Sequence, residues 1–412
     1  MPNRSAEPMP VGDENCGLLR RRLIFADPER SVVRISPDGA RVAFRAPVDG
    51  VLNLWVAPID RVDEARPVTA VTDRNLGPWI VWMRDNRHVV FFREAAGDEN
   101  WRAWRVDLDT GDVRPLTPGP GVTCYVQQSS RHFPSELLIA HNERDKRYFD
   151  IYRVNVATGE SELLQLNEGV PGYFTDQQFR VRFAVRYTED GDVEYLQRGA
   201  DGEWALLSRI GAEDAVATRA IEFSADGREL YWLDSRGRDT AAVVAQDLEN
   251  GAMLVLAEDP RADFTGLLLD PITERPVAAA RSFERVAWQV LDPDYRSDFD
   301  YLTRQSRGDL TITSMSQDRR HWIAALSIVR GRVTAAQTTG FSSPFEILDF
   351  WTKESRALRG VLADAGQRSR AIIPGDDPGH QQPPERRGLY PDPDAVAANA
   401  RLAQIRRYSR PD

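Results

Sequence analysis

Histidines are the first side chains to consider as general bases or metal ligands, and this sequence of 412 residues has five. An imidazole titrates near neutral pH, and its neutral nitrogen binds transition metals. Either use needs further ligands or a nucleophile at a suitable spacing, and no His-Glu-x-x-His motif or close cluster of His and Cys is present. We therefore predict no metal ligand and no bound cofactor. The five are His88, His132, His141, His321 and His380.

An activated serine or cysteine is the next chemistry to test. Serine hydrolases of the α/β type carry their nucleophile in a Gly-x-Ser-x-Gly turn, and that pattern does not occur in the sequence. The two cysteines, Cys16 and Cys124, lie far apart, and no second pair completes a disulfide framework or a metal site. We therefore predict no catalytic residue.

Three residues are our candidates for contact with a peptide or protein partner. Trp101 and Arg102 lie in a segment that interleaves aromatic and arginine side chains, which are common in binding hot spots. His141 begins the run His-Asn-Glu-Arg-Asp, which we interpret as a polar loop between two strands. His88 and His321 occupy equivalent positions where a turn leads into a strand, so we expect them to be structural.

A repeat of about 45 residues must position these side chains. Its marker is a turn such as Ser-Pro-Asp-Gly at residues 36–39, followed by a short apolar run, and residues 224–227 are a second copy. Pro presets the backbone of a tight turn, Asp bonds the local backbone, and Gly accepts a left-handed conformation. Many units also contain a turn of the form Asp-x-x-x-Gly, as at residues 107–111. Units begin near residues 35, 80, 128, 177, 221, 267 and 312, which makes seven.

Four antiparallel strands in each unit predict the blade of a β-propeller. We therefore expect an all-β fold, a seven-bladed β-propeller of four-stranded antiparallel blades. The inner strands are continuous apolar runs, which fits burial on both faces, and the outer strands should expose acidic and arginine side chains. Four tryptophans on equivalent strands should pack between blades; they are Trp55, Trp82, Trp232 and Trp322.

The predicted propeller covers residues 21–361. Its first unit begins with the innermost strand at 31–36, and its seventh ends with the outermost strand at 356–361, so we expect the ring to close by packing without an exchanged strand. Two units depart from the pattern, because a short helix is expected over 297–305 and a polar insertion over 330–343.

The two ends of the chain are predicted to lie outside the propeller. Residues 1–20 should form a flexible segment. Residues 362–412 should form a proline-rich tail, because six prolines fall between positions 374 and 393. Within the tail we expect a short helix over 393–407, with Pro393 at its first position.

Composition excludes several classes of partner. The net charge is −10 and the pI is near 5.2, which argues against the basic surface that nucleic acids require. The amino terminus lacks the apolar core of a secretory signal, and no apolar run approaches the roughly 18 residues that cross a bilayer. We therefore predict a cytoplasmic protein that binds neither nucleic acid nor membrane.

A family resemblance is carried by residues 22–30, 35–39 and 46–56 and, in the last unit, by Asp318, Trp322 and residues 344–350. With these residues the repeat region resembles the amino-terminal β-propeller of the prolyl oligopeptidase family of serine peptidases, and most of all its dipeptidyl and acylaminoacyl peptidase branch. The resemblance covers about residues 20–360. It implies a propeller that acts as a gate and lid over an α/β-hydrolase domain carrying the catalytic Ser, Asp and His.

We expect this chain to lack that hydrolase domain, because only about fifty residues follow the last blade. Our main hypothesis is a noncatalytic, gating-type propeller of a truncated or degenerate family member that binds a peptide or protein. One alternative is an interaction scaffold like the TolB propeller. Another is a peptidase subunit whose hydrolase domain is on a separate chain. The most distant is an enzyme with a metal held at the channel by carboxylates of several blades.

Overall fold

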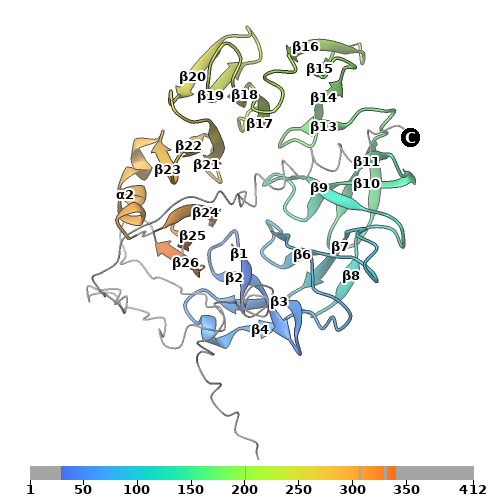
Figure 1. Cartoon of the computed structure of the whole chain (residues 1–412). Helices are drawn as coiled ribbons and strands as arrows, with labels where there is room; N and C mark the ends of the chain where they lie inside the picture. The colour runs from blue at the N-terminus through green and yellow to red at the C-terminus, as the bar shows by residue number, and fades with distance from the viewer. Residues whose placement is uncertain (1–28, 200, 306–307, 329–331, 340–412) are drawn as a thin grey trace, which may run out of the picture.

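The computed structural model describes residues 29–199, 201–305, 308–328 and 332–339. In these ranges the strands form seven antiparallel sheets, five of four strands and two of three, and each sheet contains only strands that are consecutive in the chain. Figure 1 shows the sheets following one another around a common centre. The predicted all-β propeller with four-stranded antiparallel blades is therefore confirmed. We number the sheets one to seven in chain order.

Sheets one to four each have four strands, paired in the order of the chain. A 3₁₀ turn, η1 (Val62–Glu64), precedes the last strand of sheet one. The strands are β1 (Ser31–Ile35), β2 (Arg41–Val48), β3 (Val51–Pro58) and β4 (Arg66–Pro67) in sheet one; β5 (Ile80–Trp82), β6 (His88–Arg93), β7 (Arg102–Asp107) and β8 (Val113–Pro115) in sheet two; β9 (Cys124–Ser129), β10 (Glu136–Asp145), β11 (Tyr148–Asn155) and β12 (Ser161–Gln165) in sheet three; and β13 (Gly172–Thr175), β14 (Val181–Tyr187), β15 (Val193–Arg198) and β16 (Trp204–Ile210) in sheet four.

Sheet five has four strands, whereas sheets six and seven have three each among the described residues. After the third strand of sheet six the chain forms η2 (Pro293–Tyr295) and α2 (Arg296–Gln305), so the helix expected over 297–305 is confirmed and begins one residue earlier. The strands are β17 (Arg219–Phe223), β18 (Glu229–Asp234), β19 (Ala242–Asp247) and β20 (Met253–Ala257); β21 (Phe264–Leu269), β22 (Pro276–Ser282) and β23 (Val286–Val290); and β24 (Asp309–Met315), β25 (His321–Ile328) and β26 (Arg332–Thr339).

One boundary prediction is wrong. The polar insertion expected over 330–343 contains β26, which pairs with β25 along its whole length. Backbone hydrogen bonds to a neighbouring strand outweigh the weak apolar content of this segment. The predictions for residues 1–20, 344–350, 356–361 and 362–412, including the helix over 393–407, lie outside the described residues.

Both predicted turns form as the residue types require. In the first, Gly39 N donates to the Ser36 carbonyl at 2.9 Å, and Gly39 has a φ of +74°. The Ser36 hydroxyl donates to Asp38 Oδ1 at 2.5 Å, which holds the turn together. In the second, Gly111 N donates to the Asp107 carbonyl at 2.8 Å, and Gly111 has a φ of +75°. Glycine suits both positions because it has no Cβ to clash in the left-handed region.

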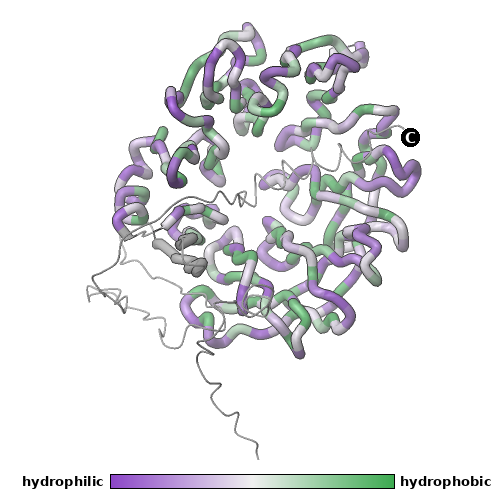
Figure 2. The backbone as a smooth tube through the Cα atoms, viewed as in Figure 1, coloured by the Kyte–Doolittle hydropathy of each residue, from purple (hydrophilic) through white to green (hydrophobic). Residues whose placement is uncertain are grey.

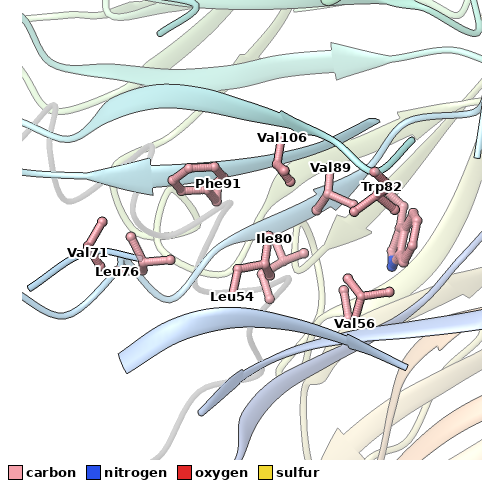
Figure 3. Packing of buried hydrophobic residues seen from close by; sticks show 11 residues of the cluster. Leu54, Val56, Val71, Leu76, Ile80, Trp82, Val89, Phe91 and Val106 are labelled. Carbon is pink, nitrogen blue, oxygen red and sulfur yellow. The ribbon is translucent and has the colours of Figure 1, made fainter. Parts of the chain in front are cut away.

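The hydrophobic core is divided into clusters between neighbouring sheets. Between sheets one and two, Leu54 and Val56 of β3 pack against Ile80, Trp82 and Phe91 (Figure 3). Between the last sheet and the first, Ile323 of β25 belongs to the cluster that contains residues of β1 and β2. Figure 2 shows apolar and polar residues interleaved around the whole ring, as expected when every sheet buries two faces.

Three of the four predicted tryptophans are buried between sheets, in clusters that join neighbours. Trp82 is 7 %, Trp232 0 % and Trp322 1 % exposed. Trp55 is half-buried against the cluster of sheet one, and its Nε1 donates to the Ala46 carbonyl at 3.0 Å. The tryptophans therefore pack the core, as predicted.

The outer strands differ from the expectation of acidic and arginine side chains. Strands β12, β16 and β20, the last strands of sheets three to five, expose aliphatic side chains. Leu163 is 48 %, Leu206 56 % and Leu254 63 % exposed. No further strand of these sheets covers them. Scattered apolar residues are common on protein surfaces.

Candidate functional site

The turns that join the first and second strands of the sheets contact one another and form a belt at one end of the ring, which we call the turn belt. The contacts link sheet seven to one, one to two, three to four, and four to five. They run from Gln317 N to the Pro37 carbonyl (2.7 Å), Asp38 N to Asn86 Oδ1 (2.9 Å), Ser130 Oγ to the Gln177 carbonyl (2.6 Å) and Arg182 Nη2 to the Gly227 carbonyl (3.2 Å).

Six of these turns each contain one residue with a positive φ, and in only two of the six is that residue glycine. Bulky side chains seldom adopt this conformation, and such backbone strain is concentrated at functional sites. In sheet six the turn is one residue longer, and Glu274 N donates to the Asp270 carbonyl at 2.9 Å. The six residues are Gly39 (+74°), Asn86 (+58°), Phe179 (+59°), Gly227 (+70°), Glu274 (+54°) and Arg319 (+64°).

One side chain of the turn belt reaches across the ring. Arg131 follows β9 in sheet three, and its Nη1 donates to the carbonyl of Ile272, which lies between β21 and β22 in sheet six. Sheets four and five separate these two sheets along the ring, so this hydrogen bond joins turns that are not neighbours. The Arg131 hydrogen bond thus connects opposite sides of the turn belt.

Glu274 lies two residues beyond this contact and is only 8 % exposed. Its Oε2 is buried and has no hydrogen-bond partner. The pKa of the Glu274 carboxyl is raised to about 7: burial is the largest cause, the negative charge of Glu222 adds to it, and Arg131 and Arg84 oppose it. Residues from sheets two, three, five and six therefore meet in one electrostatic cluster.

Arg84 is the least satisfied cation of this cluster. It is half-buried and makes no hydrogen bond or ion pair with the described residues. Burial lowers the pKa of its guanidinium, the charge of Glu274 opposes this effect, and Arg131 adds to it. No ion pair within 4.0 Å joins Glu274 to either arginine among the described side chains. Glu274 therefore interacts with the two arginines only over distances longer than an ion pair.

The cluster can exchange a proton near neutral pH, because the carboxyl of Glu274 titrates there. Within the described part of the chain, no group of three or more His, Cys, Asp and Glu side chains is placed to hold a metal ion. Over the same residues no serine hydroxyl or cysteine thiol donates to a histidine ring. Burial raises the pKa of the Cys124 thiol to about 12, which keeps it from acting as a nucleophile.

His141 lies elsewhere than predicted. The expected polar loop is wrong, because His141 belongs to β10, pairs with Asp150 of β11 and is 3 % exposed. The strand continues through a polar sequence because its polar side chains find partners: Asn142 Oδ1 accepts from Thr123 N at 2.8 Å, and Arg144 binds Asp150 at 2.8 Å. Burial lowers the pKa of His141 to about 4.

Trp101 directly precedes β7 of sheet two and Arg102 is its first residue, at the opposite end of β6 from the turn that holds Arg84. The Trp101 ring meets that of Trp79 edge-on, with centroids 5.4 Å apart, and lies against the backbone of Gly77. The Arg102 side chain is 11 % exposed and pairs with Asp98 at 3.6 Å. Cys124 links the backbones of Trp101 and His141, because its N donates to the Trp101 carbonyl at 2.9 Å and it pairs with His141 across β9 and β10.

His88 and His321 occupy equivalent positions, as predicted, at the first residues of β6 and β25. His88 Nδ1 lies 2.6 Å from Asp85 Oδ2, and His321 N donates to the Ser316 hydroxyl at 3.0 Å. Sequence reasoning missed Glu274. The available signal was an acidic residue in a turn where three other units place glycine or asparagine.

Among the described residues, no helix is both long enough and apolar enough to cross a membrane.

Comparison with known proteins identifies relatives that match three quarters of this chain. The chain is 38 % identical over 311 residues to dipeptidyl aminopeptidase BIII of Pseudoxanthomonas mexicana, which covers 75 % of this chain and 45 % of that protein. It is 24 % identical over 330 residues to dipeptidyl peptidase family member 6 of Caenorhabditis elegans, covering 75 % and 44 %. The chain thus spans less than half the length of these relatives.

Solved structures support the same fold. A structure from a study of two prolyl endopeptidases matches 80 % of this chain and 51 % of its own, with a TM-score of 0.55 and 12 % identity. At this identity the match establishes the propeller fold alone. No family model matches the sequence. Together, these findings show that the chain forms a β-propeller, that its relatives in sequence include two dipeptidyl peptidases, and that its fold matches that of a prolyl endopeptidase structure.

Proposed function

We propose that this propeller is the noncatalytic, gating part of a prolyl oligopeptidase-family peptidase and that it binds peptides. The observation that carries the proposal is the 38 % identity to a dipeptidyl aminopeptidase over three quarters of this chain. That relative acts on peptides by its name, and the matched region is less than half of it. The described residues supply a rigid ring with charged turns at one end, which suits a part that admits or excludes a peptide.

We further propose that the seven sheets are seven blades of one closed ring. The seam between sheets seven and one supports this count, because Ile35 N donates to the Ser314 hydroxyl at 3.0 Å and Ile323 packs with the core of sheet one. The turn belt crosses the same seam through Gln317 and Pro37. Among the described residues no strand of sheet seven pairs with a strand of sheet one, so closure needs no exchanged strand in this region.

Trp101 and Arg102 remain our proposed contact residues for a peptide or protein. Both keep part of their surface exposed, and each presents a group suited to a peptide, an aromatic face and a guanidinium. His141, at 3 % exposure, can affect such a site only through β10.

The test uses the full chain with two chromogenic substrates, a dipeptidyl and an acylaminoacyl p-nitroanilide. We expect no turnover sensitive to a serine-directed inhibitor and no fluorophosphonate adduct on the intact chain by mass spectrometry. A labelled decapeptide should bind saturably by fluorescence anisotropy. An adduct together with inhibitor-sensitive turnover would overturn the noncatalytic proposal, and turnover that appears only on adding a second chain would show a divided peptidase.

The contact residues are tested in the same binding assay. Arg102→Gln should weaken binding of the labelled decapeptide several-fold. Phe283→Ala is the control, because Phe283 is 58 % exposed and lies in the turn between β22 and β23 of sheet six. Equal affinity of Arg102→Gln and the control would remove Arg102 from the site. The absence of saturable binding by every variant would remove the peptide-binding role.

A further inference from the structure

The hydrogen bond between Arg131 and the Ile272 carbonyl ties sheet three to sheet six across the turn belt. The acceptor lies inside the turn that runs from Asp270 to Arg275, which is closed by two backbone bonds of 2.9 Å, Glu274 N to the Asp270 carbonyl and Asp270 N to the Arg275 carbonyl. Any rearrangement of this turn therefore moves the acceptor that Arg131 uses.

Glu274 is part of the same turn and is poorly suited to carry a charge in this geometry. Its Oε2 is buried without a donor, and an ionised carboxylate in that position loses hydration that nothing replaces. Charged neighbours come from three other sheets: Glu222 repels the charge, while Arg84 and Arg131 attract it without pairing directly. Asp270, the remaining acid of the turn, is already occupied by Arg319 at 2.6 Å and by the Tyr295 hydroxyl.

The backbone conformation at Glu274 disfavours the closed turn. Its φ of +54° lies in the left-handed region, which is unfavourable for a residue with a side chain, so the closed turn is strained even when the carboxyl is neutral. Protonation equilibria and conformation are linked: a geometry that disfavours the carboxylate is itself disfavoured once the carboxyl ionises. Ionisation therefore favours a turn in which the carboxylate reaches water.

We propose that the proton on Glu274 controls the tie between sheets three and six. With Glu274 neutral, the turn between β21 and β22 is closed and Arg131 bonds the Ile272 carbonyl. When Glu274 loses its proton to solvent, the turn opens to hydrate the carboxylate and Arg131 leaves that carbonyl. The turn belt then loses its cross-ring connection. This latch depends only on the described cluster and would operate whatever peptide the propeller serves.

The size of the effect follows from linkage. If the carboxyl has a pKa of about 7 in the closed turn and an ordinary value near 4.5 in the open one, the equilibrium constant for opening rises about tenfold between pH 6 and pH 8. A change of this size is measurable by hydrogen exchange, because the amides of Asp270 and Glu274 both take part in closing the turn.

The experiment is hydrogen exchange with mass spectrometry on the full chain at pH 6 and pH 8, expressed as protection factors so that the intrinsic pH dependence of exchange cancels. In the wild type, peptides covering residues 264–282 should lose about tenfold in protection at pH 8. Glu274→Gln should keep protection at both values. Arg131→Met should have low protection at both. The equivalent turn at residues 224–229 serves as an internal reference that should not change.

Glu258→Gln is the matched control, because Glu258 is 66 % exposed and pairs with Arg238 on the surface; it should behave as the wild type. If Glu274→Gln does not fold, Glu274→Gly replaces it, since Gly39 and Gly227 occupy the corresponding positions. The latch is refuted if the wild type has equal protection at both pH values, or if removing the acid leaves its pH dependence intact.

Discussion

Replacing His141 with phenylalanine should remove a pH-dependent contribution to stability. The imidazole is 3 % exposed, it stacks on the Tyr152 ring with centroids 4.0 Å apart, and its Nδ1 has no hydrogen-bond partner. Burial lowers the pKa of His141 from 6.5 to about 4, Asp150 opposes the shift, and Lys146 adds to it. The folded protein therefore keeps the ring neutral, whereas the unfolded chain takes up a proton as the pH falls below 6.5.

The magnitude follows from the two pKa values. Between pH 6.5 and pH 4 the unfolded state binds more protons than the folded state, so the free energy of unfolding falls as the pH falls. Since one pKa unit corresponds to about 1.36 kcal/mol, the loss is roughly 2 kcal/mol by pH 5 and roughly 3 kcal/mol near pH 4. With an unfolding entropy of about 2 cal/mol/K per residue over roughly 300 residues, 2 kcal/mol corresponds to a Tm lower by about 3 °C.

The assay is urea unfolding of the wild type and His141→Phe at pH 7.5 and pH 5. Phenylalanine keeps the stack on Tyr152 but has no titrating group, so the difference in unfolding free energy between the two proteins should change by about 2 kcal/mol between these pH values. The difference is needed because Glu274, with its raised pKa, favours the folded state at low pH and acts in the opposite direction. Exposed His132, replaced by glutamine, is the control. Parallel stability curves for the wild type and His141→Phe would refute the reasoning.

Three further predictions concern single residues. Gly111→Ala should cost about 1 kcal/mol in urea unfolding, because its φ is +75° and open space surrounds the added Cβ, whereas Gly39→Ala should cost more, because the Cβ would lie 2.7 Å from His321 Nδ1; equal losses would contradict the steric argument. Cys124 should resist iodoacetamide in the folded chain at pH 8 and react after unfolding, as read from its tryptic peptide, and rapid native labelling would contradict its raised pKa. Asp150→Asn should destabilise the fold by about 2 kcal/mol in the same unfolding assay, since the 1 % exposed carboxylate binds Arg144 and Asn167 N, and a neutral effect would show that the amide replaces it.

The fold was predictable because each unit encodes its own turns and strands. Gly39 and Gly111 mark turns that form through contacts a few residues apart, and apolar runs such as β6 are buried on both faces. Strand β26 was missed because its identity depends on pairing with β25, and its residues include few large apolar side chains. Tertiary pairing decides such a segment, and local sequence carries little of that information.

The candidate site was largely beyond sequence reasoning. Glu274, Glu222, Arg131 and Arg84 come from four sheets, so nothing in their spacing along the chain indicates that they meet. His141 was placed in a loop because its neighbours are charged, yet partners on β11 and before β9 satisfy them inside a strand. The recurring turn could have pointed to Glu274, because an acid stands where a left-handed residue is needed.

Because every sheet is built from consecutive strands, the strands that pair are close in sequence, and the sheets can form one after another as the chain is synthesised. The seam is different, since Ile35 and Ser314 are 279 residues apart in sequence. The entropy of closing so long a loop must be overcome before any seam contact is gained. One face of sheet one therefore has no packing partner until sheet seven has been synthesised. Ring closure should be the last step of folding and the one most easily interrupted.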